Sequence, residues 1–231
     1  MSNLVDIVRG LINSIGQCIP IDRVEDSTLF VCSSTGWLTI GSIIKIDDLE
    51  YEVTAVEQNV GITVEPYKHD TAVSSDTTEI CQPKITFLHG KPSSVNDEYT
   101  LIDEYTKDKT PFLWLYESYD YGAGKRDSVL EAEYRARIFL LDYAKAEEWS
   151  NDQHNERVIK PMENLARLII DYIRSDWSFK DPEVYKVKVH PRFGVDTPWR
   201  VDDKKIIDED LSGVELTLDI NMFNLDICNC K

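Results

Sequence analysis

The residues whose types and spacing come nearest to a known binding motif lie in the run Gly122-Ala123-Gly124-Lys125-Arg126, where glycines precede two cations. A phosphate-binding loop of the Walker A type needs GxxxxGK[ST], because backbone amides, a lysine and a hydroxyl surround the phosphates together. Here Tyr119 stands at the first glycine position and Arg126 at the hydroxyl position. We therefore expect a flexible hairpin loop whose tip, Lys125 and Arg126, offers a small basic contact surface.

The cysteines and histidines lack the spacing of a metal site. Cys228 and Cys230 form one CxC pair, and zinc sites usually combine such a pair with a second Cys or His pair. No second pair lies near it, and no histidine belongs to an HExxH motif. Five cysteines in 231 residues are sparse, and an odd number cannot all pair, so a disulfide framework is not expected and the thiols should be free. We also expect no metal and no cofactor. The remaining cysteines and the histidines are Cys18, Cys32, Cys81, His69, His89, His154 and His190.

A catalytic site finds little support either. There is no GxSxG nucleophile motif, and the acidic pairs Asp47-Asp48 and Asp202-Asp203 lie in turn contexts that account for them. One polar group at the start of an expected helix remains a candidate, although such helix ends are usually solvated. Its members are Asp152, His154, Glu156 and Arg157. We expect that the chain is not an enzyme.

Net charge narrows the classes of partner. The 231 residues hold 42 Asp and Glu against 25 Lys and Arg, a formal net charge of −17. Residues 1–90 carry −8 of it and residues 91–231 carry −9, so neither half is basic. Such a chain is poorly suited to grip nucleic acid or an anionic membrane surface. No apolar run reaches the roughly 18 residues of a membrane span, and the N-terminus does not resemble a secretory signal. We expect synthesis in a cytosol.

Hydrophobic periodicity divides the chain into three parts. Residues 1–19 predict an amphipathic helix over 3–16, because apolar residues recur at i, i+3, i+4 and i+7. Residues 20–88 hold five short β-branched runs separated by turn formers, which predict a small antiparallel barrel or sandwich. The runs are 28–32, 42–46, 51–56, 62–65 and 85–88, of which the second and third form a hairpin.

Residues 89–231 predict an α+β domain. A short helix is expected over 94–105 and a buried strand over 111–116. Residues 133–142 favour another strand, with a helix as the alternative. Ser150 opens a helical region in which Pro161 should kink the helix or begin a second one. Strands are also expected at 184–189 and 199–202, and a half-exposed strand at 214–222. The predicted fold class is α+β: a small antiparallel β-barrel-like module plus a mixed or antiparallel sheet packed on helices.

The order of elements in the last two thirds of the chain carries a resemblance. It runs from the strand PFLWLYE (111–117) through a polar loop to the strand EYRARIFLL (133–141). A helix pair follows, around NERVIKPM (155–162) and residues 165–173, and then an edge strand GVELTLDI (213–220). This order resembles the tail-terminator and head–tail joining (neck) proteins of tailed bacteriophages. The resemblance covers residues 85–231, and residues 20–88 stand outside the basic terminator unit as an inserted module.

The resemblance implies a structural virion protein without catalytic residues. It implies a ring of six or twelve copies in the neck or tail, made in the host cytoplasm, with DNA passing through the channel. Portal, adaptor or tail-tube proteins would be its neighbours. The loop 117–132 would be an arm, and Arg135 and Arg137 would form one side of a charge-matched contact with carboxylates of the next copy.

Two other functions remain open. In one, the chain is a non-enzymatic adaptor whose module at 20–88 docks a protein partner. In the other, the polar helix start around His154 belongs to an unrecognised enzyme site. The mass of the protein in solution distinguishes a ring from an adaptor.

Overall fold

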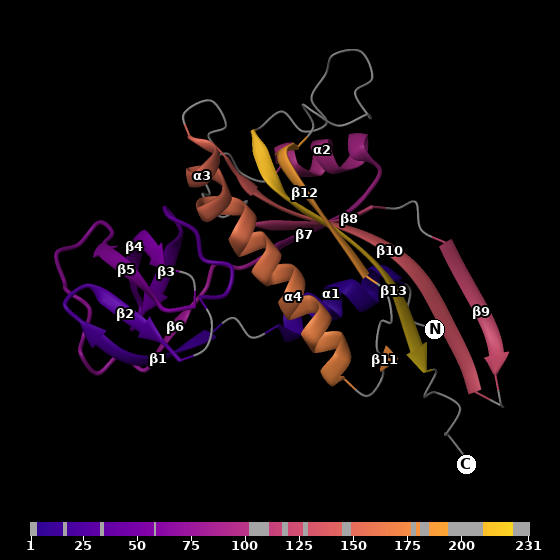
Figure 1. Cartoon of the computed structure of the whole chain (residues 1–231), viewed down its shortest axis with the longest axis horizontal. Helices are drawn as coiled ribbons and strands as arrows, with labels where there is room; N and C mark the ends of the chain where they lie inside the picture. Colours follow the sequence, from indigo (N-terminus) through magenta and orange to yellow (C-terminus); the bar gives the residue numbers. More distant parts are fainter. Residues whose placement is uncertain are drawn as a thin grey trace.

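The computed structural model places a small barrel at one end and a larger sheet with helices at the other (Figure 1). It describes residues 4–15, 18–32, 35–57, 59–101, 111–116, 120–126, 129–144, 149–176, 179–180, 185–193 and 210–223. Within those ranges the protein is α+β, with a closed six-stranded antiparallel barrel, a seven-stranded mixed sheet and helices. The predicted combination of an antiparallel barrel and a mixed sheet is confirmed.

The barrel follows from short alternating strands joined by tight turns. Its inward side chains, such as Leu29, Val53 and Ile80, are fully buried in one core. Asp47 and Asp48 both have positive φ, 49° and 68°, and link two strands as a two-residue turn, which confirms the predicted hairpin. In order β1-β2-β5-β4-β3-β6 the strands are β1 (Cys18–Glu25), β2 (Thr28–Val31), β5 (Gly61–Pro66), β4 (Leu49–Glu57), β3 (Ile43–Ile46) and β6 (Glu79–Cys81), and β6 returns to β1.

The larger sheet is built around two long central strands, β10 (Val129–Tyr143) and β13 (Leu211–Phe223). On the far side of β13 lie β11 (Phe179–Lys180) and β12 (Tyr185–Phe193). On the far side of β10 lie β8 (Phe112–Tyr116) and β9 (Asp120–Arg126). The strand β7 (Thr86–Gly90) pairs parallel with β8 and makes the sheet mixed.

Helices cover both faces of this sheet. On one face lie α1 (Leu4–Ser14) and α4 (Lys160–Ser175), whose apolar stripes share a core with β10 and β13. On the other lies α2 (Pro92–Leu101). Ser150 caps α3 (Asn151–His154) in a capping box with Gln153, as expected for a helix start. A π-helical turn (Asn155–Ile159) then leads to Pro161 in the first turn of α4, the second helix that the proline predicts. None of the described helices is long and apolar enough to cross a membrane.

The barrel is inserted into the larger unit between α1 and β7. The buried side chains of α1 belong to the core of α4, β10 and β13, although residues 18–81 separate α1 from that unit in sequence. The barrel also sends Trp37 into the same core. Asn164 Nδ2 of α4 donates to Gly36 O at 3.3 Å, and Thr39 Oγ1 donates to Asp142 Oδ2 at 3.3 Å. The loop between β2 and β3 therefore anchors the barrel.

Several sequence-based expectations are wrong. The run 85–88 becomes β7 in the larger sheet, since its neighbour is β8 and not a barrel strand. Residues 120–126, expected as a flexible loop, form β9, because backbone hydrogen bonding to β10 needs no side chains and tolerates the glycines. The expected edge strand 213–220 is interior, because β10 and β12 flank it. The barrel strands β1 and β6 are not among the strands predicted from the sequence. The expected strand at 199–202 lies outside the described residues.

Candidate subunit interface

The candidate site is the half of one sheet face on which none of the described helices packs. Side chains of β10 and β13 alternate between the faces, so that Ile138 and Leu216 pack toward α1 and α4. Of the helices that the structure describes, α2 packs on the opposite face, where Val95 and Tyr99 contact one end of it. At the other end it carries charged and polar side chains. We call this set the open sheet face: Arg135, Arg137, Lys186, Lys188, Thr217 and Asp219.

The strand register gathers these cations from two strands. Arg137 lies opposite Thr217, which lies opposite Lys186 on its other side. Directly opposed residues of antiparallel strands share a face, so the three form one row across the sheet. The next rows pair Arg135 with Asp219 and Lys188 with Glu215. Arg135, Lys186 and Lys188 are exposed, and they lie beside the carboxylates of Glu215 and Asp219, which the register places on the same face.

Arg137 already has an ion-pair partner within the chain. It makes an ion pair with Glu215, whose second oxygen, Oε2, accepts from His190 Nε2 at 2.9 Å. The side chains of Glu215 and His190 are each only 8% exposed. Burial raises the pKa of Glu215, but the hydrogen bonds from His190 and Arg137 and the charge of Arg137 outweigh it and lower the pKa to about 2. This network holds β10, β12 and β13 together.

Arg135 is available for an outside partner. Its guanidinium lies 3.8 Å from Asp219, and the two side chains are 67% and 44% exposed. Exposed ion pairs of this kind contribute at most about 1 kcal/mol, so a stronger acidic partner can replace Asp219. Sequence reasoning therefore named two arginines with different roles, one bound inside the sheet and one at its surface.

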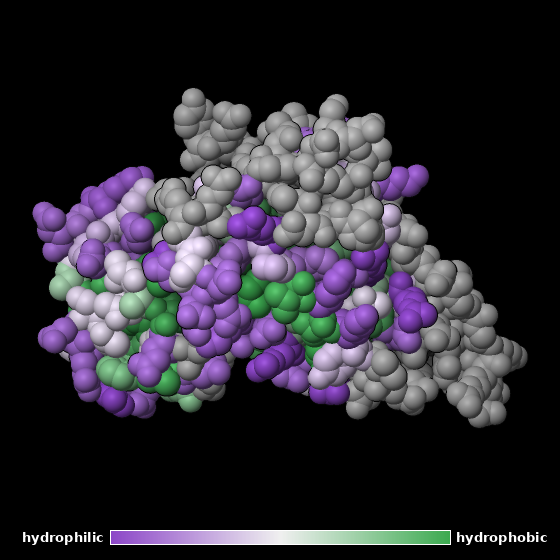
Figure 2. Space-filling model, turned by 45° about the horizontal axis from the view of Figure 1, so that its top comes forward, coloured by the Kyte–Doolittle hydropathy of each residue, from purple (hydrophilic) through white to green (hydrophobic). Residues whose placement is uncertain are grey.

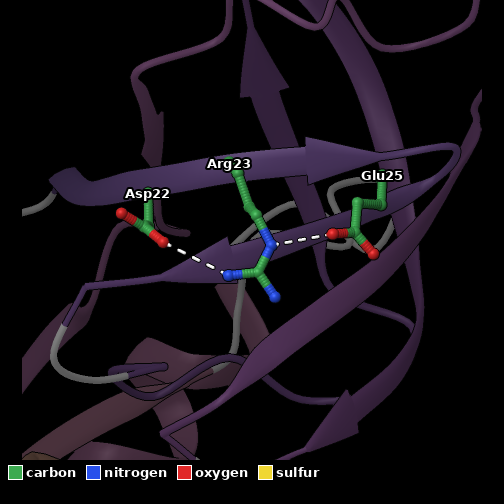
Figure 3. A network of polar contacts seen from close by, with 3 residues as sticks. All are labelled: Asp22, Arg23 and Glu25. Atoms are coloured by element: carbon green, nitrogen blue, oxygen red, sulfur yellow. Dashed lines mark hydrogen bonds and ion pairs between the residues drawn. The ribbon is translucent and has the colours of Figure 1, made fainter.

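The barrel carries the opposite charge. Residues 18–81 contain twelve Asp and Glu against three Lys and Arg, a net charge of −9. One of the three cations, Arg23, lies 2.8 Å from Glu25 and 3.4 Å from Asp22 on the same strand (Figure 3). Hydrophilic residues dominate the barrel surface, at the left of Figure 2. The barrel is thus an acidic body, opposite in sign to the exposed side chains of Arg135, Lys186 and Lys188.

His154 does not act as a base toward a serine. It is buried, and its Nε2 lies 2.6 Å from Ser212 Oγ. The Ser212 hydroxyl donates to Pro191 O at 2.6 Å, and a carbonyl only accepts. His154 must therefore donate to the serine oxygen, whereas a nucleophilic serine needs a histidine that accepts its proton. Burial, assisted by the charge of Arg192, lowers the pKa of His154 and keeps the ring neutral.

The other members of the polar helix start do not join His154. Asp152 and Glu156 are exposed, and Glu156 pairs with Lys160. The Arg157 guanidinium lies over the ring of Trp149, 5.1 Å from its centroid. The expectation that His154 is solvated is wrong, because its partner Ser212 comes from a strand 58 residues later. No local signal in the sequence links the two.

The expected basic tip falls at the end of a hairpin. Arg126 pairs with Val129 and Lys125 with Leu130, so residues 127 and 128 connect β9 to β10. The side chains of Lys125 and Arg126 are not described. Cys228 and Cys230 also lie outside the described ranges. Among the residues the structure does describe, no three His, Cys, Asp or Glu side chains form a group that could hold a metal.

Acid should weaken the protein through Glu215. Its pKa is about 2 in the folded state against an ordinary 4.5, so its stabilising contribution is complete above pH 4.5 and is lost as the pH falls toward 2. The difference corresponds to about 3 kcal/mol of unfolding free energy. Urea unfolding of the wild type and Glu215→Gln at pH 6 and pH 2.5 measures it. The gap between the two proteins should shrink by most of that amount at pH 2.5, and a gap independent of pH would contradict the assignment.

No protein-family model and no curated protein matches this chain.

Proposed function

We propose that this chain is a non-enzymatic structural protein of a tailed-phage virion. It forms a ring of six or twelve copies at the head–tail junction, as a neck or tail-terminator component. Its partners are other copies of itself and the neighbouring portal, adaptor or tail-tube proteins. The support from the sequence is the element order after residue 85, which resembles that family. The support from the structure is a pair of complementary surfaces.

Opposite charge on two separate surfaces carries the proposal. The barrel holds −9, whereas the open sheet face holds Arg135, Lys186 and Lys188 in exposed positions. The barrel lies at the left end of the molecule in Figure 1, and β9 with the adjoining part of β10, which includes Arg135, lies toward the right end. A head-to-tail ring needs two different surfaces that fit each other. Charge complementarity also selects the correct register between copies.

The acidic character of the chain agrees with a channel that DNA crosses. Phosphate groups are attracted by clustered Lys and Arg and repelled by carboxylates. A ring in which Arg135, Lys186 and Lys188 face the neighbouring copy leaves a wall with more carboxylates than cations, along which DNA slides without being held. Assembly in the host cytoplasm and final location in the virion follow from this role.

An adaptor is the second candidate function. The barrel has its own hydrophobic core and is inserted into a complete α+β unit, which is the arrangement of an added recognition module. In that case the barrel docks a different protein, and no ring forms.

The mass of the protein in solution tests the ring. We expect light scattering to give six or twelve times the chain mass of 26.6 kDa at low salt, alone or on added tail tubes, and less at high salt. The double variant Arg135→Glu with Lys186→Glu should shift the midpoint of assembly to at least about tenfold higher protein concentration, since two attractive contacts become repulsive.

The control keeps the same charge change away from the open sheet face. Arg167 on α4 and Lys84 before β7 are both exposed, and their replacement by glutamate should leave assembly within about twofold of wild type. A strict monomer at every concentration, with or without tail tubes, contradicts the ring. Equal effects of the two double variants contradict the assigned surface.

A further inference from the structure

Two cysteines that are far apart in sequence meet on the outside of the barrel. Cys18 begins β1 and Cys81 ends β6, and the two residues lie directly opposite each other in the antiparallel pair. Their Sγ atoms are 3.0 Å apart, and both residues are exposed. The strand register therefore brings two free thiols into contact where a small oxidant can reach them.

The pair lies on the seam that closes the barrel. The strand β6 has three residues, which pair with β1 at three positions and with β3 at one, Lys45 opposite Cys81. The strand β6 thus has few paired positions on either side, and the ladder that joins the first and last strands of the barrel is short. A covalent link between Cys18 and Cys81 would fasten this seam and enclose the whole barrel sequence in one loop.

We propose that Cys18 and Cys81 form a reversible disulfide by exchange with a small-molecule disulfide such as oxidised glutathione. The thiolate of one cysteine attacks a sulfur of oxidised glutathione, which breaks the S–S bond and releases one glutathione thiolate. The second cysteine, after losing its proton, attacks the resulting mixed disulfide and releases the second glutathione. The two protein thiols are oxidised, two glutathiones are the reduced products, and the two protons pass to the released thiolates.

The geometry suits this bond. Opposed residues of antiparallel strands have Cα atoms about 4.5–5.5 Å apart, and disulfides accept about 4.4–6.8 Å. The sulfurs need to approach by roughly 1 Å to reach the S–S bond length, which side-chain rotation can supply without moving the strands. The hydrogen bond to Cys81, reinforced by burial and nearby negative charge, raises the pKa of Cys18 to about 11, so that Cys18 keeps its proton.

The experiment uses the full chain with Cys32, Cys228 and Cys230 replaced by serine, so that only the pair remains. After incubation with oxidised glutathione the intact mass should fall by two hydrogen atoms. Trypsin should then release peptide 10–23 linked to peptide 69–84, since Arg9, Arg23, Lys68 and Lys84 set those cuts. The melting temperature should rise by about 5 °C or more and return on reduction with dithiothreitol.

The matched control adds Cys18→Ser to the same background. Its single thiol at Cys81 should accept one glutathione as a stable mixed disulfide, with no linked peptide and no comparable rise in melting temperature. If the serine background folds poorly, the same tryptic peptide mapping on wild-type protein still tests for the linked peptide. Glutathione retained on the intact pair without the linked peptide overturns the proposal. A linked peptide that forms without a rise in melting temperature overturns the role of the bond in fastening the seam.

Discussion

Replacing Trp37 by alanine is expected to lower the free energy of unfolding by about 3–5 kcal/mol, the usual loss for a large aromatic side chain in a core. Trp37 is 1% exposed and lies in the core of the α+β unit, although it belongs to the chain segment of the barrel. Its backbone N–H donates to Gln82 Oε1 at 2.9 Å and its indole Nε1 donates to Pro83 O at 3.0 Å. The variant should therefore also loosen the barrel from the rest of the molecule.

Urea unfolding followed by circular dichroism measures the loss, and limited proteolysis measures the loosening. Cleavage should increase between the barrel and the α+β unit, near residues 33–42 and 82–85. The matched control is Trp149→Ala, because Trp149 is only partly buried beneath Arg157 and should cost clearly less. A loss below about 1 kcal/mol for Trp37→Ala, or a similar loss for both variants, would contradict the anchoring role.

The anchor shows why the parts of the fold were easier to predict than their arrangement. Period-two runs revealed β2 to β5, and the stripe from Met162 to Ile173 revealed α4, since these patterns are local. No local pattern in the sequence predicts that Trp37 packs in the core of the α+β unit and not in the barrel core. The run 85–88 has the same difficulty, because a short apolar strand looks the same in a barrel and in a larger sheet.

The candidate site shows the same limit in its charges. Alternation along 214–222 suggests that Glu215 faces water, yet it is buried, because Arg137 and His190 reach it from strands 78 and 25 residues away in sequence. Lys186 and Lys188 alternate with valines, and this alternation predicts a strand. Their position on the same face as Arg135 depends on the pairing of β12 with β13, which the alternation does not reveal. The cysteine pair is likewise a product of the barrel's closure.

The two ion pairs on β10 and β13 should respond very differently to loss of their carboxylates. We expect Glu215→Ala to destabilise the protein by about 3–5 kcal/mol, because it removes the buried carboxylate that Arg137 and His190 share. Asp219→Ala makes the same kind of change two rows away, at a pair exposed to solvent, and should change stability by less than about 1 kcal/mol. Urea unfolding at pH 7 compares the two directly.

A third variant separates the pair's own contribution from the cost of a lone buried charge. Replacing Arg137 and Glu215 together by methionine should restore much of the stability lost in Glu215→Ala, since apolar pairs often substitute well for buried ion pairs. The same variant bears on assembly. If Arg137 serves only the sheet, the double methionine protein should assemble at the same concentration as wild type, whereas Arg135→Glu with Lys186→Glu should need at least about tenfold more protein. If the methionine variant remains folded but does not assemble, Arg137 also contacts the neighbouring copy.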